Sequence, residues 1–184
     1  TVRFEVRTGD GVPPEGTVGR RGARCIVCEA SVPFDHVRAE GRAGRMRARL
    51  MAMVAEGARN RVYLAPVDEH ERAAAVGIPP DAPDSQLPPK ALGFRVQAYG
   101  MTRHRDLFTA RQLVALTTFS DLVAEAREQA RADAIAAGLP DDGRRLEEGG
   151  TGAPAYADAI ATYLGMGVSR LSDICNALCR WEVS

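Results

Sequence analysis

Two cysteines near the start of the chain have the spacing of a metal-binding turn. Cys25 and Cys28 flank two apolar residues in the run Cys25-Ile-Val-Cys28. Two thiolates at this spacing on a tight turn can both face one tetrahedral Zn²⁺, which is why zinc ribbons and knuckles use it. A closed structural zinc site needs four ligands, and this pair supplies only half of them. We therefore predict a half zinc site at Cys25 and Cys28, with a redox dithiol and an unmetallated remnant as the alternatives.

The remaining candidate ligands do not complete this site on spacing alone. His36 is the nearest candidate third ligand in the sequence, but its distance from Cys28 matches no zinc ribbon. Cys175 and Cys179 have i, i+4 spacing, which predicts two sulfur atoms on one helical face. We interpret this second pair as small thiols on an apolar helix face. A four-cysteine site would require the C-terminal helices to fold back.

Arginine is concentrated around the first cysteine pair. Residues 20–61 contain ten arginines against four carboxylates, although the whole chain has 24 basic and 24 acidic residues. Guanidinium groups match phosphate oxygens in bidentate geometry, and neighbouring glycines let a backbone approach them. We predict that four arginines of the Gly/Arg-rich segment contact nucleic-acid phosphates: Arg42, Arg45, Arg47 and Arg49. A merely solvated basic face is the alternative.

Composition limits the class of protein. A chain of 184 residues, 45% hydrophobic and 26% charged, is typical of a globular protein with one substantial core or two small ones. Zero net charge means that any electrostatic function is local. Without a long apolar run or a charged-then-apolar leader, we expect a cytoplasmic protein with no membrane partner. The chain starts at threonine in a strand-like run over residues 1–6, so we expect a piece of a longer protein.

The elements that position these residues follow from local patterns. Residues 50–55 and 61–65 are two apolar runs separated by Gly and Asn, which predicts a β-hairpin. A short helix is expected over residues 69–75, with an acidic first turn. Prolines make residues 77–90 an extended linker, and residues 93–99 are strand-like.

The last third of the chain predicts two long helices. The capping box Thr109-Ala-Arg-Gln112 begins the first, and apolar residues recur at three- and four-residue steps up to Gly138. The second begins near Pro154, and its apolar pattern runs on to Trp181. An acidic, Gly-rich loop joins the two helices, so they should form an antiparallel hairpin.

The predicted fold class is α+β, a small β-rich half zinc ribbon with a hairpin, followed by a long antiparallel helical hairpin. Three regions follow: residues 1–66 form the half zinc ribbon and basic β-hairpin, residues 67–91 the short helix and Pro-rich linker, and residues 92–184 the helical hairpin region.

Several short motifs, taken in chain order, resemble those of a known family. They are Gly16-Thr-Val, Arg24-Cys-Ile-Val-Cys28, Arg38-Ala-Glu-Gly-Arg-Ala-Gly-Arg45, Leu92-Gly-Phe-Arg-Val-Gln97, Tyr99-Gly-Met, Asp106-Leu-Phe-Thr-Ala-Arg-Gln-Leu113, Thr117-Thr-Phe119, Tyr156-Ala-Asp-Ala-Ile160 and Leu178-Cys-Arg-Trp181. Together they resemble the central region of the large, zinc-ribbon-containing adenine-specific DNA methylases. In that family an S-adenosylmethionine loop and a first cysteine pair lie upstream, and a catalytic Asp-Pro-Pro-Tyr lies downstream.

Neither catalytic element of that family occurs in this sequence. Each Pro-Pro pair lacks the preceding polar residue and following aromatic that would hold a flipped adenine, and no glycine-rich loop follows an apolar strand. The resemblance therefore implies an internal fragment of an S-adenosylmethionine-dependent adenine-specific DNA methyltransferase. This fragment would be inactive alone and would not bind S-adenosylmethionine. Cys25 and Cys28 would be the second pair of a zinc ribbon, and the partners would be DNA, through the parent protein, and the rest of the methylase chain.

One departure from the family pattern bears on that interpretation. The family knuckle has glycine after its second cysteine, where a left-handed turn needs it, whereas this chain has Glu29.

A different class of function is a non-catalytic protein-interaction module that uses the helical hairpin. Exposure of one apolar face would favour the module: Tyr156, Tyr163, Leu171 and Leu178. In the methylase hypothesis these residues instead pack against the first helix. A third hypothesis, an autonomous redox protein, finds no βαβ pattern to support it.

Overall fold

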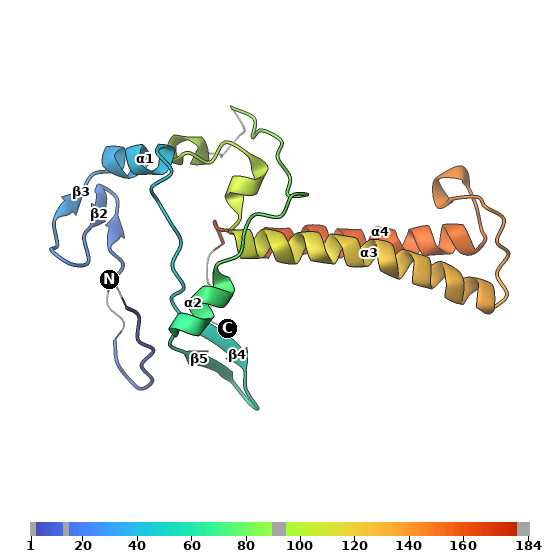
Figure 1. Ribbon diagram of the computed structural model, residues 1–184, viewed down its shortest axis with the longest axis horizontal. Coiled ribbons are helices and arrows are strands. Elements are labelled where there is room, and N and C mark those ends of the chain that lie inside the picture. Colours follow the sequence, from blue (N-terminus) through green and yellow to red (C-terminus); the bar gives the residue numbers. More distant parts are fainter. Residues whose placement is uncertain (1–2, 13–14, 90–94, 180–184) are drawn as a thin grey trace. The chain divides into compact units, whose positions relative to one another are not determined.

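The computed structural model describes residues 3–12, 15–89 and 95–179, and the chain divides into two compact units (Figure 1). The first unit comprises Thr1–Val76 and Asp84–Asp106, and the second comprises Gly77–Pro83 and Leu107–Ser184. Small antiparallel sheets lie in the N-terminal part, and two long helices pack as a hairpin in the second unit. The predicted α+β class is confirmed.

A small three-stranded sheet opens the first unit. Its strands are β1 (Val18–Gly19), β2 (Gly22–Arg24) and β3 (Ser31–Val32), paired antiparallel in that order. The strand expected over residues 1–6 is wrong for residues 3–6, the part that the structure describes, because these residues join no sheet. Arg3 and Phe4 instead line a hollow together with residues at the start of the short helix that follows the β-hairpin. Thr1 and Val2 lie outside the described residues.

Helix α1 (Phe34–Arg42) follows β3 and packs on a short 3₁₀ helix, η1 (Val96–Tyr99). The backbones touch at two glycines: a Cβ on Gly41 would lie 2.4 Å from the carbonyl oxygen of Tyr99. Gly100 ends η1 in the left-handed region, with φ of 89°. The strand-like interpretation of residues 93–99 is therefore wrong over its described part, because this turn curls the chain against α1. The part before residue 95 lies outside the described residues.

The predicted β-hairpin is present. Strands β4 (Met53–Glu56) and β5 (Arg61–Leu64) pair antiparallel. Helix α2 (Asp68–Ala74) follows, also as predicted, and Arg49 is tied to its Glu71 by an ion pair of 3.0 Å.

The Pro-rich segment has neither helix nor central strand over residues 77–89, in agreement with its proline content. It makes one isolated antiparallel bridge, between Gln86 and Arg103. The carboxylate of Asp84 forms ion pairs with Arg103 and Arg105, and Leu87 is buried. This stretch is therefore anchored to the turn that precedes the helical hairpin.

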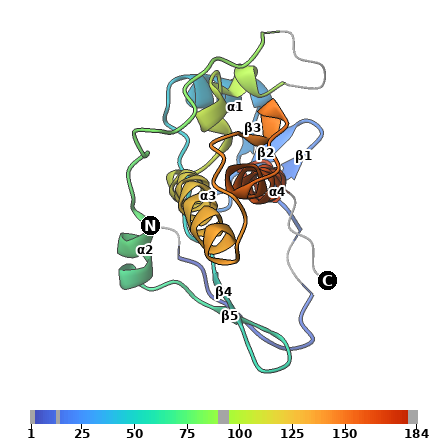
Figure 2. The same cartoon turned by 90° about the vertical axis from the view of Figure 1, so that its right-hand side faces the viewer.

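The second unit is built on α3 (Ala110–Ala136) and α4 (Ala153–Ile174), with a short 3₁₀ helix, η3 (Leu146–Glu148), in their connection. The two long helices run antiparallel and side by side (Figures 1 and 2). The predicted capping box begins α3: the Thr109 hydroxyl accepts from the Gln112 N–H, and the Gln112 side chain accepts from the Thr109 N–H.

Helix α4 ends earlier than its apolar pattern predicts. The Asn176 side chain donates to the carbonyl oxygens of Ser172 and Asp173, and it accepts from the Leu178 N–H at 2.9 Å. Such local bonds satisfy the free carbonyls of a helix end and turn the backbone away. The expectation that the helix runs through Leu178 is therefore wrong, and Trp181 lies outside the described residues.

Packing of the hairpin is uneven. Leu113 is buried near the start of α3, and alanines on both helices are buried near the connection: Ala134, Ala153, Ala155 and Ala157. Midway along the helices, Phe119, Leu122 and Leu164 are between 42% and 46% exposed. The hairpin is therefore close-packed near its two ends and open between them.

Candidate functional site

The cysteine pair lies in the tight turn that joins β2 to β3. The Cys25 N–H donates to the carbonyl oxygen of Ala30, and the Glu29 N–H donates back to the carbonyl oxygen of Cys25, both at 2.9 Å. These bonds close the turn directly beyond the Arg24 and Ser31 pair of the sheet ladder. The sheet therefore holds Cys25 and Cys28 in a preformed loop.

The backbone of this turn stabilises a thiolate. The N–H groups of Cys28 and Val27 donate to the Cys25 sulfur and lower the pKa of its thiol, and the Cys28 side chain adds a weaker contribution. Backbone donors aimed at a sulfur favour its charged form, which is the form that binds a metal. Cys25 is half-buried and Cys28 is exposed, so the pair faces outward.

Glu29 has the left-handed backbone that the turn requires. Its φ is 59°, and no other non-glycine residue in the described part of the chain has a positive φ. The zinc-ribbon family that the motifs resemble usually has glycine at this position. The structure has the left-handed turn with glutamate in place, so the N–H groups still reach the sulfur.

The described residues contain no group of three or more His, Cys, Asp or Glu side chains able to hold a metal ion. His36 lies on α1 and does not join the cysteine pair in such a group. The i, i+4 interpretation of the second pair is wrong, because Cys175 caps the end of α4 and Cys179 lies in the turn beyond it. Two thiolates in a knuckle fit half of a tetrahedral Zn²⁺ site, and within the described part of the chain no third candidate ligand joins them.

The four predicted phosphate-binding arginines are all exposed, but their surroundings differ. Arg45 forms a bidentate pair with Glu40, two bonds of 2.7 Å that lower the pKa of that carboxyl. Arg49 pairs with Glu71 on α2. Arg42, at the end of α1, and Arg47 have no ion-pair partner within the part of the chain that the structure describes. Arg42 and Arg47 are therefore the guanidinium groups free to meet an external phosphate.

One further arginine of this region is engaged internally. The Arg38 guanidinium lies 5.9 Å from the centre of the Phe34 ring and 5.7 Å from that of Tyr99. The cation–π contact with Tyr99 helps to hold α1 on η1, together with the close approach of Gly41, whereas the contact with Phe34 lies within α1. Gly41, one of the glycines of the Gly/Arg-rich segment, therefore serves the packing of α1 on η1.

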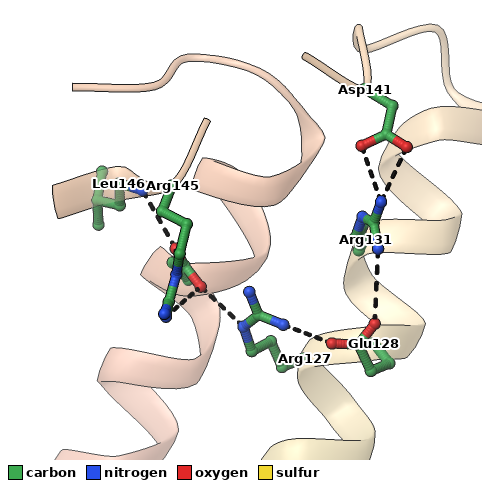
Figure 3. Close-up of polar contacts among 7 residues, drawn as sticks. Arg127, Glu128, Arg131, Asp141, Arg145 and Leu146 are labelled. Carbon is green, nitrogen blue, oxygen red and sulfur yellow. Dashed lines mark hydrogen bonds and ion pairs between the residues drawn. The ribbon is translucent and has the colours of Figure 1, made fainter. Parts of the chain in front are cut away.

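A polar cluster at the connected end of the helical hairpin was not predicted (Figure 3). The buried carboxylate of Asp158 on α4 accepts from Arg127 on α3 at 2.7 Å, from Arg145 at 3.2 Å and from the Leu146 N–H at 3.1 Å. Arg145 and Arg127 hold the pKa of this carboxyl well below its usual range. An aspartate among alanines on a buried helix face was the available sequence signal. Its bonds tie α4 to α3 and to the connection between them, so the cluster stabilises this end of the hairpin.

Comparisons with family models, with curated proteins and with solved structures find no match to this chain. No helix within the described ranges is both long and apolar enough to cross a lipid bilayer.

Proposed function

We propose that this chain is a non-catalytic internal region of an S-adenosylmethionine-dependent adenine-specific DNA methyltransferase. In this proposal Cys25 and Cys28 supply two ligands of a zinc ribbon, and Arg42 and Arg47 contact DNA phosphates with the support of Arg45 and Arg49. The chain itself carries out no methyl transfer, because it has neither the cofactor loop nor the catalytic tetrapeptide.

The observation that carries the proposal is the preformed knuckle. A pair of surface thiols without a metal-binding role has no need of two backbone N–H groups directed at one sulfur, nor of a left-handed non-glycine residue beside it. Both features are what a metal-binding turn requires, because they preorganise a thiolate in the geometry of a ligand. The motif order along the chain supports the choice of parent family.

Zinc binding by cysteine variants tests the proposal. Zinc taken up by the full chain is measured by competition with a chromophoric chelator, in the presence of a reducing agent. Cys25→Ser with Cys28→Ser should abolish the uptake. The matched pair Cys175→Ser with Cys179→Ser should leave it unchanged, because those sulfur atoms lie in no knuckle. Equal zinc uptake by the two double variants and the unmodified chain would contradict the proposal.

A second candidate is the protein-interaction module, and one observation favours it. Tyr156, Tyr163 and Leu178 are 50%, 73% and 51% exposed. Leu171, the fourth residue of that face, is half-buried and lines a groove together with side chains of α3, so the condition for the module is met at three of its four residues.

A further inference from the structure

The cysteine knuckle holds its two sulfur atoms next to each other. The Cys28 thiol donates a hydrogen bond to the Cys25 sulfur, so the two atoms that a disulfide would join are already neighbours. A tight turn also keeps the Cα atoms of its first and fourth residues within about 7 Å, close to the range of about 4.4–6.8 Å that disulfides span. The pair can therefore close into a disulfide without opening the turn.

The backbone on both sides of the pair is fixed by the sheet. The Cys25 N–H donates to the carbonyl oxygen of Ala30, and the Glu29 N–H donates to that of Cys25. The entropy of bringing the two sulfur atoms together is therefore lost when the turn folds, before any reaction takes place. An unfolded chain with the same spacing must lose that entropy during the reaction. The folded turn should thus favour a Cys25–Cys28 disulfide more strongly than the unfolded chain does.

Small molecules can reach this turn from the solvent. Cys28 is exposed, and Cys25 is half-buried. The two side chains between them, Ile26 and Val27, are 61% and 79% exposed, so they do not cover the sulfur atoms. A small reagent therefore meets Cys28 first, and Cys25 is the neighbour that reacts next.

The second cysteine pair has different surroundings. The Cys179 thiol donates to the carbonyl oxygen of Asp173 at 3.3 Å, whereas the Cys28 thiol bonds to a sulfur. Cys175 caps the end of α4, and its N–H donates to the carbonyl oxygen of Leu171. Cys179 is exposed like Cys28, so it provides an internal comparison: an accessible thiol outside a knuckle.

We propose that Cys25 and Cys28 form a thiol–disulfide exchange site for small disulfides, at which the pair is oxidised to an intramolecular disulfide. The Cys28 thiolate attacks one sulfur of the small disulfide, whose S–S bond breaks; a mixed disulfide forms, and one small thiolate leaves. The Cys25 thiolate then attacks the Cys28 sulfur, and the second small thiolate leaves. The pair loses two electrons and two protons, and the small disulfide takes them up to become two thiols.

This inference goes beyond the proposed zinc ribbon, because the exchange needs no metal. The two states exclude each other, since a sulfur atom in a disulfide is no longer a thiolate that can bind Zn²⁺. The redox state of the pair would therefore decide whether the knuckle can take up zinc.

Equilibration of the full chain in glutathione buffers, with a chelator present, tests the inference. After acid quenching and alkylation, peptide mass spectrometry gives the state of each cysteine. Closing the knuckle releases two molecules of reduced glutathione, whereas a mixed disulfide releases one. Tenfold dilution of both glutathione forms at a constant ratio should therefore raise the ratio of disulfide to dithiol at Cys25–Cys28 about tenfold. Mixed disulfide at Cys179 should not change. A knuckle that forms only mixed disulfides would overturn the proposal.

The same titration in urea separates the folded turn from the bare spacing. The equilibrium constant for the Cys25–Cys28 disulfide should be about tenfold or more larger in buffer than in urea. Equal constants would overturn the proposal, because any pair at this spacing can then do the same. Cys28→Ser should leave Cys25 with a mixed disulfide that dilution does not change, and Cys179→Ser should leave the constant of the knuckle unaltered. Because no zinc takes part, failure of zinc uptake and failure of the exchange are separate results.

Discussion

Replacing Glu29 by glycine should stabilise the cysteine knuckle. Glu29 is held at φ of 59°, where a side chain costs about 1–2 kcal/mol because Cβ crowds the backbone. Glycine removes this cost but loses about 0.5–1 kcal/mol more backbone entropy on folding. The net expectation for Glu29→Gly is therefore a stabilisation of the turn by about 0.5–1 kcal/mol.

Native-state hydrogen exchange measures this local effect. The amides of Arg24 and Cys25 report on the turn, because they donate to the carbonyl oxygens of Thr17 and Ala30. A gain of about 0.5–1 kcal/mol should slow their exchange by about two- to fivefold, since exchange from local opening follows the opening free energy. The same amides in an otherwise unchanged chain provide the baseline.

Ala30→Gly is the matched control for this experiment. Ala30 has no positive φ, so glycine there only adds entropy to the unfolded chain and should speed exchange by a similar factor. Two glycines at adjacent positions are therefore expected to act in opposite directions. Faster exchange in Glu29→Gly, matching that in Ala30→Gly, would refute the left-handed turn and with it the argument for a preformed thiolate site.

Two further predictions concern charged groups. Because the folded-state pKa of Asp158 is lowered, its stabilising effect is complete above the unfolded Asp pKa of about 4 and declines as the pH falls below it. The melting temperature of the unmodified chain should therefore fall as the pH drops below about 4. Asp158→Asn should lower the melting temperature at pH 7 and make it depend less on pH in this acidic range. A variant whose melting temperature falls with acid as steeply as that of the unmodified chain would contradict the role of Asp158. DNA affinity, measured by fluorescence anisotropy against salt, should lose about 2 units of log–log slope in the Arg42→Ala/Arg47→Ala double variant. Arg45→Ala/Arg49→Ala should change the slope less, because these guanidinium groups are already paired, and the reverse order would count against free phosphate contacts.

Elements with strong local signals could be predicted from the sequence. The capping box at Thr109 locates the start of α3, and Gly and Asn between two apolar runs locate the β4–β5 turn. The spacing of Cys25 and Cys28 likewise predicts a knuckle. In each case residues close in sequence determine the backbone, so no distant contact is needed.

The missed features depend on contacts between distant residues. Helix α1 contains Gly41, which reads as a loop signal, but the glycine is there because the Tyr99 backbone lies against it. The end of α4 is set by Asn176, whose side chain competes with an apolar pattern that otherwise continues. Composition alone likewise could not show whether the Arg45 guanidinium is paired with Glu40 or free.

The Asp158 cluster also fixes where each side chain of the hairpin lies along its length. Alanine-rich helices have shallow ridges, so little else prevents one from sliding past the other. A slip of one turn moves a helix by about 5.4 Å, which would pull the Arg127 guanidinium out of reach of the Asp158 carboxylate. The cluster therefore fixes the register of α3 against α4 from the connected end of the hairpin. Phe119 and Leu171, many residues away, are kept in register by a contact that neither of them touches.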